Sequence, residues 1–299
     1  MFRLPPMIRS MSRLQTFAPA KVNLTLCVLA RRTDGYHDLS SLVVFADKGD
    51  ELALQPGTGL ELSVEGPLAA QAGPRNGNLV LKAARALQER VENLQLGRFE
   101  LTKHLPAGAG LGGGSADAAA ALRLIAQANE LELNDARILE AARSIGADVS
   151  VCLESKARLM HGIGEILSAP LPLPKLDAVI VFPGAPIATK DVFGNFTLVA
   201  GPRRKTRYAD TEIPLERGSL LDFLAREAND LELAARLAEP AISEAKTLLE
   251  QTGEARVVRM SGSGSALFAL YDNASHAKRA ATKISKRKPD WWVKAATLN

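Results

Sequence analysis

Cysteine is scarce in this sequence, and its scarcity argues against two kinds of protein. The chain has 299 residues but only two cysteines, Cys27 and Cys152, and both lie in apolar stretches. Isolated cysteines of this kind are typical of buried, reduced thiols, so we expect no disulfide scaffold. Cysteine and histidine residues with the spacing of metal ligands are also missing, and we predict no metal held by the chain itself.

Long apolar runs are missing as well. No stretch approaches the roughly 18 uninterrupted apolar residues that a membrane-spanning helix requires. Residues 1–16 contain three arginines and no acidic residue, but they lack the apolar run of a secretory signal and are short for an organelle transit peptide. We therefore expect a cytoplasmic protein with no membrane partner.

Aromatic residues make up only 5% of the chain, and none is interleaved with the basic clusters at residues 203–207 and 278–288. Surfaces that stack on nucleic-acid bases combine the two residue types. The net charge of +4 and the pI of about 9.1 suit anionic ligands such as nucleotides, although charge alone does not separate these from RNA. We interpret both clusters as solvated surface and expect no nucleic-acid partner.

The remaining composition is that of a globular protein, with 46% hydrophobic and 23% charged residues. Strands and helices follow one another without strict alternation, which predicts the α+β class. Periodicity predicts strands at residues 17–30, 39–46, 51–54, 60–64, 99–103, 178–182, 256–260, 265–271 and 291–296, with a turn at 47–50. It predicts helices at residues 79–91, 115–129, 134–145, 219–235, 240–251 and 274–286.

The proline-rich stretch at residues 168–174 interrupts these elements. The length of the chain allows one large domain or two of ordinary size. Domain boundaries fall in such linkers, so we predict one domain over residues 1–170 and a second over residues 171–299.

The strongest local signal is a glycine-rich loop between a predicted strand and a predicted helix. Five glycines occur within the seven residues 108–114, and Ser115 follows them. Glycine permits positive φ and removes the Cβ, so successive backbone N–H groups can converge on an anion at the start of a helix. The loop matches neither the Walker pattern nor the dinucleotide fingerprint. We predict a phosphate site, the alternative being a flexible surface loop with Ser115 as an ordinary helix cap.

Three further segments carry weaker signals. Lys21 and Asn23 are two residues apart on a predicted strand and so share one face, which is unusual inside an apolar run. Asp148 stands among small and apolar residues, where a carboxylate is costly unless it caps a helix or serves a site. Residues 259–266, here called the Ser/Gly segment, predict a tight turn that lets one backbone approach another closely. An edge strand, an N-cap and a plain turn are the respective structural alternatives.

In this order, the segments resemble the three motifs of the GHMP kinase superfamily of small-metabolite kinases. The matching residues are 19–24, 105–119 and 260–268. Shorter motifs resemble the branch that phosphorylates a cytidine diphosphate derivative of methylerythritol, in the non-mevalonate route to isoprenoid precursors. These motifs are residues 34–37, 146–149 and 162–165, and the resemblance runs from about residue 17 to the end of the chain.

The resemblance implies a fold of two α+β domains, a ribosomal S5-like N-terminal half and a ferredoxin-like C-terminal half. ATP, accompanied by Mg2+, and the second substrate would meet in the cleft between them. Asn78 and Lys103 fall where members of the superfamily contact the adenine nucleotide. The loop that would hold the phosphates, here called the phosphate loop, comprises Pro106, Ala107, Gly108, Ala109, Gly110, Leu111, Gly112, Gly113, Gly114 and Ser115.

The resemblance also implies roles for residues outside the loop. Asp148 would accept the proton of the attacking hydroxyl group, with Lys21 beside it to keep the carboxylate ionised. Asn23 would support Lys21 or the substrate. The residues that would recognise the cytosine are Tyr36 and His37, together with Phe193, which follows Thr189.

Two alternatives remain open at this stage. The first is another GHMP kinase of the mevalonate or homoserine type, although a substrate without a base has no need of a stacking tyrosine. The second is a non-catalytic nucleotide-binding or RNA-binding relative, against which the retained Lys21 and Asp148 argue. Whichever GHMP kinase the chain is, we expect small-molecule substrates and a monomer or weak homodimer.

Overall fold

The computed structural model describes residues 12–196 and 213–299, so the basic cluster at 203–207 lies outside the described residues. The strands are β1 (Leu14–Asn23), β2 (Cys27–Arg31), β3 (His37–Gly57), β4 (Leu60–Glu65), β5 (Leu96–Thr102), β6 (Arg158–Gly162), β7 (Ile166–Leu167), β8 (Leu176–Phe182), β9 (Ala255–Met260), β10 (Leu267–Tyr271) and β11 (Trp292–Leu298). The helices are α1 (Leu79–Gln88), α2 (Gly113–Ala128), α3 (Ala136–Ile145), α4 (Ala147–Cys152), α5 (Thr189–Phe196), α6 (Arg217–Arg226), α7 (Glu232–Ala238), α8 (Pro240–Glu250) and α9 (Ala274–Arg287). This mixture confirms the predicted α+β class.

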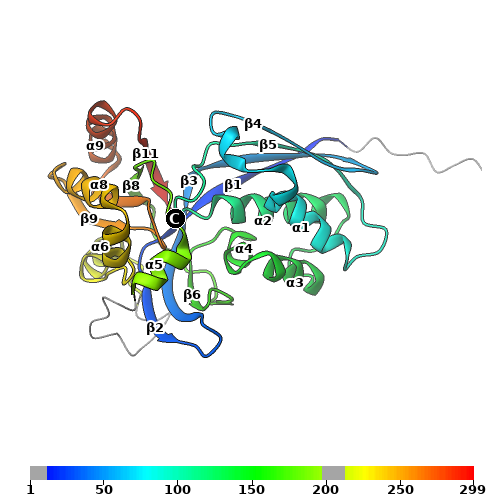
Figure 1. The fold of residues 1–299 in the computed structure, drawn as a ribbon, viewed down its shortest axis with the longest axis horizontal. Helices are drawn as coiled ribbons and strands as arrows, with labels where there is room; N and C mark the ends of the chain where they lie inside the picture. Colours follow the sequence, from blue (N-terminus) through cyan, green and yellow to red (C-terminus); the bar gives the residue numbers. More distant parts are fainter. Residues whose placement is uncertain (1–11, 197–212) are drawn as a thin grey trace, which may run out of the picture.

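One long strand, β3, organises the N-terminal part of the fold. It pairs antiparallel with β1 and β5 toward its C-terminal end and with β2 and β6 toward its N-terminal end. Helices α1 to α4 lie together beside β1, β3 and β5 (Figure 1). Eleven of the 16 residues of α2 are buried, and most of them are alanines. Small side chains let this helix pack closely against the sheet and its neighbouring helices at once.

The C-terminal part is a second group of antiparallel strands, in the order β11-β8-β10-β9. Helices α8 and α9 pack on these strands, away from α1 to α4 (Figure 1). Strand β8 is buried along most of its length, as expected for the predicted strand at 178–182. The two parts meet where Leu298 pairs with Ala46 of β3 and where Asn299 exchanges two backbone hydrogen bonds with Phe45, of 2.8 and 3.0 Å.

The proline-rich stretch has no helix or strand, as predicted. One core cluster nevertheless contains apolar side chains from both sides of residue 170, such as Leu42 and Ile180. The division into domains at that residue therefore stays a prediction.

Three details of the predicted elements were wrong. The predicted strand at 17–30 is two strands, β1 and β2, which pair with different stretches of β3. The predicted turn at 47–50 lies inside β3, because Gly49 permits the close approach of β1 and Asp50 turns its carboxylate inward to bind backbone amides. The predicted helix at 219–235 is interrupted between α6 and α7, where the side-chain amide of Asn229 donates hydrogen bonds to the carbonyls of Met260 and Gly262.

Within residues 12–196 and 213–299, no helix has the length and apolar character needed to cross a membrane.

Candidate active site

Three neighbouring cavities surround the predicted site residues. A cavity of about 720 Å³ is lined by Lys21, Tyr36 and Asp148, among others. A second, of about 340 Å³, is lined by the whole phosphate loop. A small cavity of about 140 Å³ shares Lys21 and Asp148 with the first and loop glycines with the second, so it connects the two regions. The fold therefore brings the segments singled out in the sequence to one place.

The phosphate loop has the backbone conformation that its glycines allow. Gly108, Gly110 and Gly112 have φ values of +67°, +77° and +65°, a region that side chains with a Cβ disfavour. Helix α2 begins at Gly113, and no side chain caps its first turn. The interpretation of Ser115 as a helix cap was therefore wrong, since the helix starts two residues earlier. Uncapped amides at a helix N-terminus are available to an anion.

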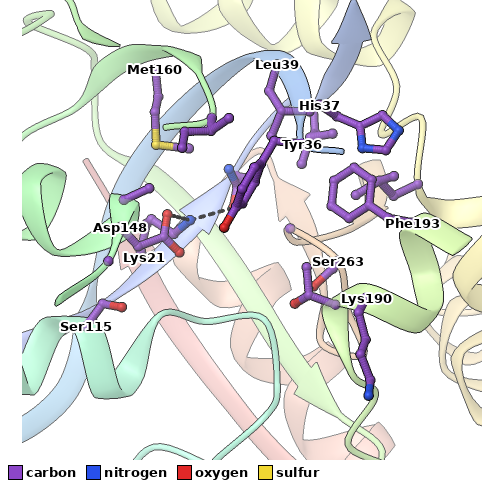
Figure 2. A pocket seen from close by; sticks show the side chains of 18 of the residues that line it. Lys21, Tyr36, His37, Leu39, Ser115, Asp148, Met160, Lys190, Phe193 and Ser263 are labelled. Carbon is purple, nitrogen blue, oxygen red and sulfur yellow. Dashed lines mark hydrogen bonds and ion pairs between the residues drawn. The ribbon is translucent and has the colours of Figure 1, made fainter. Parts of the chain in front are cut away.

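Lys21 and Asp148 form an ion pair at the junction of the cavities. The Lys21 Nζ atom lies 2.9 Å from Asp148 Oδ1 and also donates a hydrogen bond of 3.1 Å to Asn23 Oδ1. The lysine side chain is 5% exposed, whereas that of Asp148 is 38% exposed. Figure 2 shows the pair joined by a dashed line in the pocket. A buried ammonium thus holds a carboxylate that a ligand can still reach.

Asp148 lies in the first turn of α4, a short helix that follows Gly146. The predicted alternative of an Asp N-cap was wrong, because Gly146 occupies the cap position. The neighbouring Cys152 is buried, and burial raises the pKa of its thiol to about 12. The thiol therefore remains protonated at neutral pH and cannot act as a nucleophile.

The Ser/Gly segment packs directly against the phosphate loop and β1. The Ser261 hydroxyl accepts a hydrogen bond from the Asn23 N–H at 3.1 Å and donates one to the Gly110 carbonyl at 3.2 Å. The Asn23 amide donates to Ser41 Oγ at 2.7 Å. Since Asn23 also binds Lys21, these contacts connect the buried ammonium to the loop. The close approach predicted for this segment is confirmed.

The other end of the large cavity is aromatic. The rings of His37 and Phe193 are stacked, with centroids 4.7 Å apart and an angle of 23° between their planes. Tyr36 is 60% exposed at the same cavity. Thr189 shares a hydrogen bond of 2.9 Å with Ser263 of the Ser/Gly segment. Figure 2 shows the two stacked rings at the right and the Tyr36 ring between them and the Lys21–Asp148 pair.

The two residues predicted to lie beside the nucleotide both line the cavity of the phosphate loop. Asn78 caps α1, its side-chain oxygen accepting a hydrogen bond of 2.9 Å from the Val80 N–H. Lys103 is buried between the carboxylates of Asp50 and Asp117. Burial alone would lower the pKa of Lys103, but the two carboxylates outweigh it and raise the pKa.

Sequence reasoning missed Asp50 and Asp117, and it also missed Arg31 and Lys190, which line the large cavity. Asp50 was hidden in the predicted turn. Asp117 did carry a signal, because it is the lone acidic residue in an alanine-rich helix. Arg31 and Lys190 stand beside predicted motifs but have no pattern of their own.

Among the described residues, no group of three or more His, Cys, Asp or Glu side chains could hold a metal ion. Mg2+ at nucleotide sites is commonly held through phosphates, waters and one or two carboxylates. A single partly exposed carboxylate, Asp148, beside a phosphate loop fits that manner of binding.

The sequence matches known families and relatives along nearly its whole length. Residues 78–156 match the family model described as the GHMP kinases N terminal domain, and residues 215–290 match the GHMP kinases C terminal model. The 4-diphosphocytidyl-2-C-methyl-D-erythritol kinase of Rhodopseudomonas palustris (strain BisB18) is 49% identical over 299 residues, which cover 97% of each chain. That of Azorhizobium caulinodans is 48% identical over 288 residues, which cover 96% of this chain and all of that one.

Solved structures give the same result at the level of the fold. A crystal structure of 4-(cytidine 5'-diphospho)-2C-methyl-D-erythritol kinase superposes with a TM-score of 0.78 at 34% identity, covering 96% of this chain and 99% of that chain. Homoserine kinase from Cytophaga hutchinsonii gives a TM-score of 0.70 at 21% identity, covering 100% of this chain and 97% of that chain. The L. major mevalonate kinase gives 0.66 at 15% identity, covering 98% of both chains. The last two likenesses concern the fold alone.

Proposed function

Since the chain belongs to the 4-diphosphocytidyl-2-C-methyl-D-erythritol kinases of the GHMP superfamily, we infer that it transfers a phosphoryl group from ATP to 4-diphosphocytidyl-2-C-methyl-D-erythritol. The acceptor would be the 2-hydroxyl group, and the products would be the 2-phosphate and ADP. The family places this reaction in the non-mevalonate route to isoprenoid precursors. The observation that carries the assignment of residues is the Lys21–Asp148 pair, which lies between the phosphate loop and the aromatic cavity.

Asp148 is proposed as the base that accepts the proton of the attacking hydroxyl group. Its carboxylate is 38% exposed and can reach a ligand, while the Lys21 ammonium at 2.9 Å favours its ionised form. Lys21 also places positive charge where the transferred phosphoryl group would carry its negative charge. Asn23 holds Lys21 in this position through the hydrogen bond to Nζ.

The phosphate loop is proposed to hold the phosphates of ATP. Its three positive-φ glycines and the uncapped start of α2 present backbone N–H groups without side chains in the way. Asn78 and Lys103 would lie beside the nucleotide, because both line the same cavity. Mg2+, when bound with ATP, would neutralise phosphate charge, and the partly exposed carboxylate of Asp148, which lies beside loop glycines, would share it.

The aromatic end is proposed to bind the cytidine diphosphate end of the substrate. Tyr36 offers an exposed ring face for stacking, and the His37 imidazole can hydrogen-bond a base edge. Phe193 packs on His37 and would fix its orientation. Thr189, at the first position of α5, lies on the path from this end toward Asp148.

The test is to mix the purified protein with ATP, Mg2+ and 4-diphosphocytidyl-2-C-methyl-D-erythritol and to follow ADP release. We expect turnover by the wild type and a fall in kcat of roughly two to four decades in Asp148→Asn, the range for loss of a general base. Asp290→Asn, an exposed acid outside the site, is the matched control and should keep full activity.

Each result would change a different part of the proposal. Turnover that survives Asp148→Asn would leave the kinase but remove Asp148 as its base. Absence of turnover, with ATP still bound, would point to another metabolite acceptor within the superfamily. A cytoplasmic location and a monomer or weak homodimer stay predictions.

A further inference from the structure

A buried ion triad lies behind the phosphate loop, apart from the Lys21–Asp148 pair. It consists of Asp50 from β3, Lys103 directly after β5 and Asp117 from α2. Their exposed fractions are 0%, 4% and 3%. Three ionisable groups with so little exposure are costly to bury unless they serve one another or a ligand.

The two carboxylates of the triad are not equally satisfied. Asp50 Oδ1 accepts hydrogen bonds from the N–H groups of His104 and Leu105 at 2.6 and 2.7 Å, and its Oδ2 binds Lys103. Asp117 Oδ2 accepts from Lys103 Nζ at 2.7 Å, but its buried Oδ1 has no hydrogen-bond donor among the described residues. Within the described part of the chain, Asp117 is therefore the member of the triad that has a carboxylate oxygen without a hydrogen bond.

The triad reaches the nucleotide cavity. Lys103 and Asp117 line that cavity together with the phosphate loop. A Cβ atom on Gly113, the first residue of α2, would lie 3.4 Å from Lys103 Nζ. The ammonium thus sits directly behind the first turn of the helix at which phosphates are proposed to bind.

The charge of the triad conflicts with that ligand. Two carboxylates and one ammonium sum to −1 when all are ionised, in a buried place where charges are weakly screened. The other groups that face Asp117 do not compensate: Cys152 of α4 stays neutral, and Lys21 of β1 is paired with Asp148. The phosphates of a nucleotide would meet this excess negative charge behind the loop.

We propose that Asp117 is a positioning residue of the nucleotide site, which holds the Lys103 ammonium behind the phosphate loop and takes up a proton when a nucleotide binds. The inference rests on the proposed function only in that the loop binds ATP. Proton uptake leaves a neutral triad, with Asp50 and Lys103 paired and the acid group of Asp117 hydrogen-bonded to them. The proton comes from solvent.

The protonation state of Asp117 suits this role. Burial raises its pKa to about 7, Lys103 opposes this rise, and the charge of Asp50 adds to it. The group is therefore partly protonated near neutral pH before any ligand arrives. Further negative charge in the loop would raise its pKa again, and one unit of pKa changes nucleotide affinity about tenfold.

The test measures ATP binding calorimetrically in buffers of different ionisation enthalpy, which reports the protons taken up. Near pH 7.5 the wild type should take up more protons on binding ATP than Asp117→Asn does. As the pH is raised from about 6.5 to about 8, the affinity of the wild type for ATP should fall by up to about tenfold more than that of Asp117→Asn. The terminal phosphate of ATP also titrates in this range, but equally in both proteins. Equal proton uptake by the two proteins would overturn the proposal.

Two further measurements separate positioning from mere stability. Asp117→Ala, which leaves Lys103 held by Asp50 alone, should raise KM for ATP several-fold and leave KM for the methylerythritol substrate unchanged. Equal effects on both would contradict a role in the nucleotide site. If the variants do not fold, infrared difference spectra of the wild type should gain the band of a protonated carboxylic acid on ATP binding, and its absence would overturn the idea. Failure of the wild type to bind ATP would instead refute the proposed function.

Discussion

At the scale of residues, two lysines of the site differ in what surrounds them. Lys21 is paired with one carboxylate that is 38% exposed, whereas Lys103 is enclosed by two carboxylates that are almost fully buried. Only the first arrangement lets a substrate hydroxyl reach a carboxylate. The second keeps a positive charge fixed behind the loop. The two lysines therefore differ in their surroundings: the carboxylate beside Lys21 is open to a ligand, and those beside Lys103 are not.

The aromatic residues give a prediction at this scale. Tyr36→Ala should raise KM for the cytidine-containing substrate about 5- to 150-fold and leave KM for ATP unchanged, because stacking of a base on an exposed aromatic ring is worth about 1–3 kcal/mol. Steady-state kinetics with each substrate varied in turn would measure this. Phe17, which is 42% exposed and lines a separate cavity, gives the control variant Phe17→Ala. A rise in KM for ATP alone would place the base of the substrate elsewhere.

At the scale of elements, the phosphate loop is shaped by the segment packed against it. The Ala109 carbonyl accepts a hydrogen bond of 2.8 Å from the Ala266 N–H, and the Gly110 carbonyl accepts one from Ser261. Asn229, between α6 and α7, in turn fixes the carbonyls of Met260 and Gly262. The conformation of the loop therefore depends on elements more than a hundred residues away.

Gly110→Ala tests this dependence. A Cβ atom at Gly110 would lie 2.6 Å from the Gly264 carbonyl oxygen, and the backbone there has φ of +77°. The Ser/Gly segment must shift, so we expect KM for ATP to rise about tenfold or more and the protein to lose about 1–3 kcal/mol of stability. Gly59→Ala is the control, because a Cβ there meets nothing within 4 Å and its φ lies outside the range of +20° to +160° that strains a side chain. Steady-state kinetics would give KM for ATP, and thermal unfolding would give the stability of both variants. Equal values for Gly110→Ala and Gly59→Ala would show that the Ser/Gly segment does not determine the conformation of the phosphate loop.

At the scale of the whole molecule, several polar contacts connect the N-terminal and C-terminal parts, and Arg259 of β9 makes one of them, to Leu24. Its guanidinium is buried and donates to the Leu24 carbonyl at 2.6 Å, and to the carbonyls of Leu224 and Glu227 at 2.6 and 2.5 Å. Leu24 immediately follows β1, which carries Lys21. One side chain thus fixes the strand that carries Lys21 relative to α6.

Arg259→Met should lower the free energy of unfolding by about 2–4 kcal/mol, since buried carbonyls lose charge-assisted hydrogen bonds. Arg259→Lys should recover little, because an ammonium cannot reproduce the planar fork that reaches several carbonyls. Arg279→Met is the control, as that arginine is exposed and paired on the surface. Denaturant unfolding would measure all three. Equal stability of Arg259→Met and the control would show that the contact does not join the two parts.

Much of the site could be read from the sequence because its signals are local. The phosphate loop depends on glycine conformations and on the start of α2, and both are written in consecutive residues. Lys21 and Asp148 stood out as polar residues in apolar segments, but it was the resemblance to the GHMP kinases that implied their roles. Their predicted roles stay proposals, but the fold does bring them within 2.9 Å of each other.

Patterns in consecutive residues were enough to predict the α+β class, most of the helices and strands, the phosphate loop and the resemblance to the GHMP kinases. Tertiary structure decided which charges meet. Asp50 was assigned to a turn and Asp117 to an ordinary helix, because nothing local shows that β3 passes beneath Lys103. Dihedral preferences act between neighbouring residues, whereas the burial of a charge and the choice of its partner depend on how distant parts of the chain cross. Only the folded chain could therefore show that a buried carboxylate, that of Asp117, lines the cavity of the phosphate loop and has one oxygen unpaired among the described residues.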